Sequence, residues 1–229
     1  GFRLFQQLVS SKTLLVLSQI FTKFATRLKR KMSKSIEIQV LDKIKRSPRG
    51  TLFFVDSFAT IGNTKSVNKA LERLVKSGEL HRVSTGIYVR PVIDDYIGKV
   101  LPSIEEIAVA IAKRDRATIV PTGSYAMYKL GLTTQVPLNI VYYTDTSARK
   151  IKIGKQTITF KKASSKNLSF VGETSMLAIQ AFRTIGKDKA TDSEIKQIKT
   201  LLKKENPKYL QHDLLLAPVW IRKIIAPTK

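Results

Sequence analysis

Residues 63–90 read NTKSVNKALERLVKSGELHRVSTGIYVR, and this stretch decides the fold expected for the first part of the chain. Asn63 is a favourable N-cap residue, and Gly78 is favourable just beyond a helix end. Between them, apolar side chains recur at the spacing of one helix face. These side chains are Val67, Ala70, Leu71 and Leu74. Two short alternating runs then flank a turn with Gly86, which predicts a β-hairpin over residues 80–90.

The residues before this stretch complete a familiar order of elements. Ser35 precedes a helical stripe over residues 36–44 that ends before Pro48. Residues 51–58 combine a short apolar run with the possible start of a short helix. Helix, short connector, helix and basic hairpin is the order of a winged helix-turn-helix. We therefore predict such a unit over residues 32–91.

The second helix of this unit carries the side chains expected to contact DNA. In a helix-turn-helix this helix presents a polar face to the major groove, while its apolar stripe packs on the first helix. Asn can bond adenine, Arg and Lys reach guanine, and hydroxyl groups and Lys hold phosphates. The candidate contacts on the helix are Thr64, Lys65, Ser66, Asn68, Lys69 and Arg73. The candidate contacts on the hairpin are His81, Arg82, Ser84, Thr85 and Arg90.

The overall charge also favours a polyanionic partner. The chain has 41 Lys and Arg against 17 Asp and Glu, a net charge of +24, and the basic excess remains when residues 1–31 are left out. Such an excess indicates attraction to nucleic acid or to an anionic membrane surface. The alternative is a winged helix used only for protein contacts, in which Lys65, Lys69 and Arg73 form an ordinary solvated face. The absence of cysteine excludes a disulfide framework, a Cys-based zinc site and a thiol nucleophile.

The remaining chain predicts a second domain of mixed composition over residues 99–229. Ser103 and Glu106 form a capping-box pattern at the start of a helix. Short strands, a helix that Gly131 ends and a hairpin over residues 149–162 follow, and the end of the chain is helical. We place the boundary between the two domains near residues 91–99. The predicted fold class is therefore α+β, with a winged helix-turn-helix followed by a mixed α/β domain that ends in helices.

The hairpin over residues 149–162 is strongly basic and forms a second candidate surface. Its lysines are Lys150, Lys152, Lys155, Lys161 and Lys162. They suit a second nucleic-acid surface, RNA included. They equally suit a solvated edge strand that lysine protects from aggregation, and the sequence leaves the two interpretations open.

Residues 1–31 mix apolar and basic residues without a single acid. Polar residues interrupt the apolar run that a membrane-spanning helix needs, and the densest charge follows the apolar part instead of preceding it as in a secretory signal. An organellar transit peptide, a helix lying on a membrane surface, and an upstream extension before a native start at Met32 all remain open. We treat residues 1–31 as a separate extension and expect no stable membrane insertion.

From about Met32 the chain resembles the AbiEi-like antitoxins of bacterial type IV toxin–antitoxin (abortive infection) systems. The resemblance rests on three stretches. They are ALERLVKSGEL at 70–80 with TGIY at 85–88, PTGSYA at 121–126 with LGLTTQVP at 130–137, and RKIKIG at 149–154. The first is generic to winged helices, whereas the second and third are more specific. Residues 1–31 lie outside the resemblance.

The resemblance implies two roles for a cytoplasmic protein. In this family the winged helix represses its own operon by binding double-stranded DNA at promoter repeats. The C-terminal domain is needed to counteract a nucleotidyltransferase-like toxin, without a stable complex. We expect DNA binding to need no cofactor and no metal.

An enzyme is the rival class, and its best candidate is the Gly123-Ser124 turn. A nucleotidyltransferase needs two carboxylates on a nearby strand to hold metal ions, but the following strand ends in Asp145 alone. A hydrolase with Ser124 as nucleophile would have only His81 or His212 as a base, and the glycine pattern of a nucleophile elbow is missing. We therefore predict that the protein is not an enzyme.

Overall fold

The computed structural model describes residues 16, 22–23 and 35–225 of the chain. The interpretations of residues 1–31 concern a segment that lies outside these residues, apart from three positions. Within the described part, no helix is long and apolar enough to cross a membrane.

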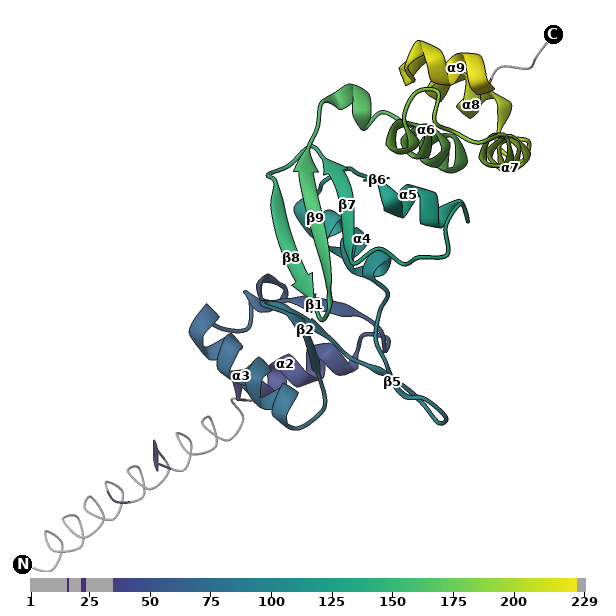
Figure 1. Cartoon of the computed structure of the whole chain (residues 1–229). Helices are drawn as coiled ribbons and strands as arrows, with labels where there is room; N and C mark the ends of the chain where they lie inside the picture. Colours follow the sequence, from purple (N-terminus) through teal and green to yellow (C-terminus); the bar gives the residue numbers. More distant parts are fainter. Residues whose placement is uncertain (1–15, 17–21, 24–34, 226–229) are drawn as a thin grey trace, which may run out of the picture.

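The first part of the described chain contains two helices, a short 3-10 helix and a three-stranded antiparallel sheet. In chain order these elements are α2 (Ile36–Lys45), β1 (Leu52–Phe54), η1 (Val55–Phe58), α3 (Thr64–Lys76), β2 (His81–Ser84) and β3 (Ile87–Val89). The sheet has the order β1-β3-β2, so the hairpin strand β3 lies between β1 and β2 (Figure 1). These elements agree with the helices, apolar run and hairpin predicted from the sequence.

Side-chain caps explain where both helices begin. Ser35 Oγ accepts a hydrogen bond from the backbone N–H of Ile38, and Asn63 Oδ1 accepts one from Ser66 at 2.9 Å. Each cap satisfies a backbone donor that has no partner within the helix. Gly78 follows α3 with a φ of 81°, a left-handed conformation that glycine adopts without steric cost. The two helices then pack on each other and on the sheet through one core cluster, which includes Val40, Ile44, Phe58, Leu71 and Leu80.

A small hairpin occupies the segment that the sequence marks as a domain boundary. Strands β4 (Val92–Asp94) and β5 (Gly98–Val100) pair with each other in a sheet of their own. The Asp94 carboxylate stabilises the turn, because it accepts hydrogen bonds from the backbone of Tyr96 and Ile97 at 2.9 and 3.0 Å. This hairpin was not predicted from the sequence.

The middle of the chain forms a four-stranded mixed sheet with two helices. Its elements are α4 (Ile104–Asp115), β6 (Ile119–Thr122), α5 (Ser124–Lys129), β7 (Asn139–Thr144), β8 (Arg149–Ile153) and β9 (Gln156–Lys162). The strand order is β6-β7-β9-β8, with β7 parallel to β9 and the other pairs antiparallel. The capping box of Ser103 and Glu106 is present at the start of α4, as predicted.

Helix α4 covers one face of this sheet, and the core beneath it extends into the first sheet. Ile107 and Ile111 of α4 pack with Ile158 of β9 in a cluster that also contains Phe54 and Ile87 of the first sheet. The two sheets therefore share one apolar cluster across the predicted domain boundary.

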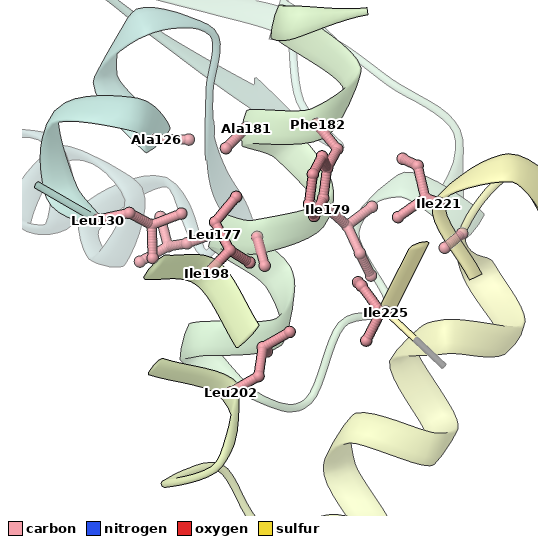
Figure 2. Close-up of a cluster of buried hydrophobic side chains, with 12 residues drawn as sticks. Ala126, Leu130, Leu177, Ile179, Ala181, Phe182, Ile198, Leu202, Ile221 and Ile225 are labelled. Atoms are coloured by element: carbon pink, nitrogen blue, oxygen red, sulfur yellow. The ribbon is translucent and has the colours of Figure 1, made fainter. Parts of the chain in front are cut away.

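The last part of the chain is helical, as predicted. A short 3-10 helix η2 (Ser165–Asn167) leads into α6 (Glu173–Ile185), α7 (Asp192–Leu202), α8 (Pro207–Leu216) and α9 (Val219–Ile225). Figure 2 shows how Ile179 and Phe182 of α6 meet Ile221 and Ile225 of α9, with Leu130 from the end of α5 in the same cluster. Taken together, these elements confirm the predicted α+β class.

Candidate nucleic-acid interface

Helix α3 buries one face and exposes the other, and the exposed face is basic. Val67, Leu71 and Leu74 are buried against the core. Lys65 and Lys69 are exposed and, at about 100° per residue, lie opposite this buried stripe. The first turn of α3 contains no acidic residue. A helix N-terminus carries partial positive charge from its unpaired N–H groups, so this end of α3 is doubly favourable to an anion.

The other residues of α3 that were predicted to contact DNA lie on either side of the line through Lys65 and Lys69. Thr64 is exposed and Asn68 is half-buried on one side. Ser66 and Arg73 lie on the side that faces α2, where they line a shallow hollow together with Glu37. There, Arg73 Nη1 donates to Glu37 Oε2 at 3.0 Å, so the guanidinium has an ion-pair partner within the protein.

Two of the hairpin residues predicted to contact DNA are engaged within the protein. Arg90 Nη1 donates to the backbone carbonyls of Lys45 and Ser47 at 3.2 and 3.0 Å, where it satisfies acceptors at the end of α2. Ser84 Oγ donates to the Lys152 carbonyl of β8 at 2.9 Å. We therefore leave Arg90 and Ser84 out of the proposed interface. Among the remaining hairpin candidates, Arg82 and Thr85 are exposed and His81 is half-buried.

The sequence prediction overlooked two further residues on the exposed face of α3. Glu72 and Lys76 are exposed and continue the line of Lys65 and Lys69 toward the end of the helix. Their spacing of three and four residues along a helix already placed them on that face. Lys76 extends the basic stripe, whereas Glu72 interrupts it.

The second basic surface divides between the two faces of the second sheet. Arg149, Ile151 and Ile153 of β8 face α4, where Arg149 pairs with Asp115 and lies over the Phe160 ring. Because side chains alternate along a strand, Lys150 and Lys152 point to the opposite face. Lys161 of β9 shares that face, while Lys162 lies on the α4 side and Lys155 in the turn. All five lysines are exposed.

The two predicted surfaces lie next to each other. The end of β8 approaches β2, and the bond between Ser84 and the Lys152 carbonyl joins the two edge strands (Figure 1). Val83 of β2 packs against the cluster shared by the two sheets. The hairpin of the first sheet and the β8–β9 hairpin therefore form adjoining parts of one surface region.

Two of the candidate catalytic residues, Asp145 and His212, have structural partners. The Asp145 carboxylate accepts hydrogen bonds from the backbone N–H of Thr118 at 3.1 and 3.3 Å. Ser124 begins α5 after Gly123, which has a φ of 66°. His212 pairs through Nδ1 with Asp213 at 2.9 Å. Within the described ranges, no group of three or more His, Asp or Glu side chains is placed to hold a metal ion.

Comparison with known proteins places the chain in a family. The search against curated proteins finds no match. Among solved structures, the chain is similar to the RV2827C protein from Mycobacterium tuberculosis, with a TM-score of 0.43 and 11% identity over 85% of this chain and 82% of that one. The profile of a family of unknown function, DUF6088, matches residues 39–210, which is most of the chain. The protein therefore belongs to the DUF6088 family.

Proposed function

We propose that the protein is a DNA-binding transcriptional regulator, in which residues 36–89 form a winged helix-turn-helix and α3 is the recognition helix. The order of elements supports this proposal, since α2, η1 and α3 are followed by the hairpin of β2 and β3. The pairing of β1 with β3 supports it as well, because it holds the hairpin beside the helices. In such a unit the recognition helix enters the major groove and the wing follows the backbone.

The observation that carries the proposal is the free basic face of α3. Lys65, Lys69 and Lys76 are exposed, and none of them forms an ion pair with another described residue. Arg73, on the flank of this face, is instead paired with Glu37. Three unpaired lysines on one helix face are therefore available to phosphates. The Asn68 amide, on the flank of this face, is of the type that bonds adenine in two places.

A protein-interaction module is the second candidate, and the β4–β5 hairpin favours it. Ile93, Tyr96 and Ile97 expose 50, 98 and 75% of their surface on this hairpin. Contiguous exposed apolar side chains mark sites of protein contact. The two functions are compatible, since the hairpin and the exposed face of α3 are separate parts of the chain.

The resemblance to AbiEi-like antitoxins extends the proposal to an operon. We propose that the bound duplex contains repeats upstream of the protein's own gene, and that the protein counteracts a nucleotidyltransferase-like toxin encoded with it. Co-expression tests the second role. Growth that the toxin arrests should recover with the wild-type chain, and continued arrest would contradict the antitoxin role without affecting the proposed DNA binding.

DNA binding is tested by gel shift of the full chain with its own upstream duplex and with a scrambled duplex. The assay is run between about 50 and 200 mM salt, because phosphate contacts alone give salt-sensitive binding without sequence preference. We expect a preference for the native duplex that Asn68→Ala removes. Lys65→Ala and Lys69→Ala should weaken binding to both duplexes.

The matched control removes two exposed lysines, Lys196 of α7 and Lys203, the residue that follows its end. This control should bind as the wild type does. The proposal would be contradicted if the wild type bound both duplexes equally and if the α3 variants and the control variant lost affinity to the same extent. Net charge alone would then explain the binding.

A further inference from the structure

The second sheet has one face that α4 covers and one that is largely open. Ile140 of β7 and Ile158 of β9 face α4, so their strand neighbours point the other way. On that opposite side, α6 covers β6, where Thr122 and Gln180 are in hydrogen-bond contact. Strands β7, β9 and β8 extend beyond α6 (Figure 1). We call the side of these three strands away from α4 the open face.

The open face is rich in cations and free of acids. Strands β7, β8 and β9 contain no Asp or Glu. Lys150, Lys152 and Lys161 all project from the open face and are exposed. None of the three forms an ion pair with another residue of the described chain. Lys150 and Lys152, two residues apart on one strand, lie about 7 Å apart along it.

Polar and planar groups lie beside these lysines. The register places Lys152 opposite Thr157 and Thr157 opposite Asn139, and it places Lys161 opposite Tyr143. Tyr143 is half-buried. The phenol ring of Tyr143, at one end of the open face, is a group on which nucleic-acid bases stack.

Protection of an exposed edge does not account for Lys152, and Lys161 lies on β9, which has a strand on either side. Edge strands carry lysine to prevent pairing with another chain. Near Lys152, however, β8 already adjoins β2 of the first sheet, where Ser84 bonds to the Lys152 carbonyl. The edge is therefore covered at the position where the lysine stands.

We propose that the open face binds a single strand of nucleic acid. Lys150, Lys152 and Lys161 contact its phosphates, and a base stacks on Tyr143. Tyr143 favours a single strand over a duplex, because the bases of a single strand are free to stack on an aromatic ring, whereas those of a duplex are stacked on one another.

This site is independent of the proposed recognition helix, and its test separates the two. Fluorescence anisotropy of the full chain is measured with labelled single strands of about 12 nucleotides, as RNA and as DNA, and with a duplex of the same sequence. The test variant is the triple substitution Lys150→Gln, Lys152→Gln and Lys161→Gln. The charge-matched control is the triple substitution Lys196→Gln, Lys203→Gln and Lys208→Gln, at α7 and α8. A further variant, Lys65→Gln with Lys69→Gln, changes the proposed recognition helix α3.

We expect the triple variant to bind single strands at least about tenfold more weakly than the wild type, and its salt slope to fall by about 2, since each phosphate contact contributes about 0.7. Tyr143→Leu should weaken single-strand binding while the lysines remain. The α7 and α8 control should bind single strands as the wild type does. Tighter binding of RNA than of DNA would identify contacts with the 2′-hydroxyl and RNA as the ligand.

Equal loss of single-strand binding in the triple variant and the control would overturn the proposal. It would also be overturned if the triple variant lost affinity for the duplex alone, because the lysines would then extend the duplex interface. If only the α3 variant loses duplex binding, this result concerns the proposed recognition helix and leaves the single-strand site on the open face intact. Circular dichroism of each variant verifies that the sheet is folded.

Discussion

At the scale of single residues, Asp213 is the most constrained carboxylate in the described chain. Its side chain is fully buried in α8. Its oxygens accept hydrogen bonds from the backbone of Val171 and Gly172 at 2.9 Å, from Ser175 Oγ and from His212. The residue therefore ties α8 to the start of α6. Asp213→Asn removes the charge and replaces one carboxylate oxygen with an amide NH₂, which would face the N–H and O–H donors around it. We therefore expect the free energy of unfolding, measured with urea, to fall by about 3 kcal/mol.

The same residue gives a pH dependence. Burial acts to raise the pKa of Asp213, but the hydrogen bonds from Ser175, His212 and the backbone outweigh it, so the pKa lies below the ordinary 3.8. A lowered pKa in the folded state adds stability that is complete above the unfolded value and is lost as the pH falls through the folded value. Below about pH 4 the wild type should therefore lose stability faster than Asp213→Asn. Asp95→Asn, at an exposed position, should follow the wild type; parallel curves for all three proteins would refute the prediction.

A second residue-scale prediction concerns the ion pair of Glu37 with Arg73. Both side chains are well exposed, so the pair adds less than about 1 kcal/mol to stability. Glu37→Gln frees Arg73 at the edge of the proposed DNA interface and removes a negative charge that repels phosphate. We expect duplex affinity to rise about threefold at low salt and the gain to shrink as salt is added. Glu79→Gln, which breaks the surface pair with Lys45, is the matched control. An equal gain in both variants would show an effect of net charge alone.

At the scale of elements, the sequence predicted best those segments whose ends carry local signals. Helix α6 spans residues 173–185 in the part of the chain predicted to be helical, and Gly186 ends its apolar run. The capping box at Ser103 likewise marks the start of α4, and the hairpin predicted over residues 149–162 is that of β8 and β9. These signals act between residues a few positions apart, so the sequence displays them directly.

Pairing over longer distances was not predictable in the same way. Strand β7 is parallel to β9, although β8 lies between them in the chain. A hydrophobic pattern shows which face of a strand is buried but not which strand lies beside it. The site shows the same limit, since the hydrogen bonds of Ser84 and Arg90 depend on carbonyls of residues far away in sequence. Their residue types alone suggested contact with phosphate instead.

The β4–β5 hairpin allows a prediction at the element scale. A two-stranded hairpin without further support is marginally stable in water. Its residues Ile93 and Ile97 are exposed instead of packed. We expect its backbone amides, over residues 92–100, to exchange with deuterium much faster than those of β7 and β9. Protection equal to that of β7 would contradict the isolated hairpin and would show that a partner covers it in solution.

At the scale of the whole molecule, the apolar clusters are linked and do not divide at the predicted boundary. The cluster beneath α4 joins Phe54 and Ile87 of the first sheet to the second sheet. Helix α5 then connects this cluster to the C-terminal helices, since Tyr125 belongs to the former and Ala126 to the latter. A change in the first sheet can therefore reach the end of the chain through packed side chains. This predicts one cooperative unfolding transition, where the sequence suggested two domains.

The only tryptophan in the chain makes this prediction measurable. Trp220 lies in α9, where it packs against the cluster of the C-terminal helices, so its fluorescence reports on that region. Far-ultraviolet circular dichroism reports on all helices and strands. Ile87→Ala removes a buried side chain at the junction of the two sheets and should cost about 3 kcal/mol. If the clusters unfold together, the midpoints of the fluorescence and circular dichroism transitions both shift to a lower denaturant concentration by the same amount. Ile44→Ala, in the core of the first part alone, should behave likewise. A shift of the circular dichroism curve with an unchanged fluorescence curve would instead show that the first part unfolds independently, and the shared cluster beneath α4 would then contribute little to stability.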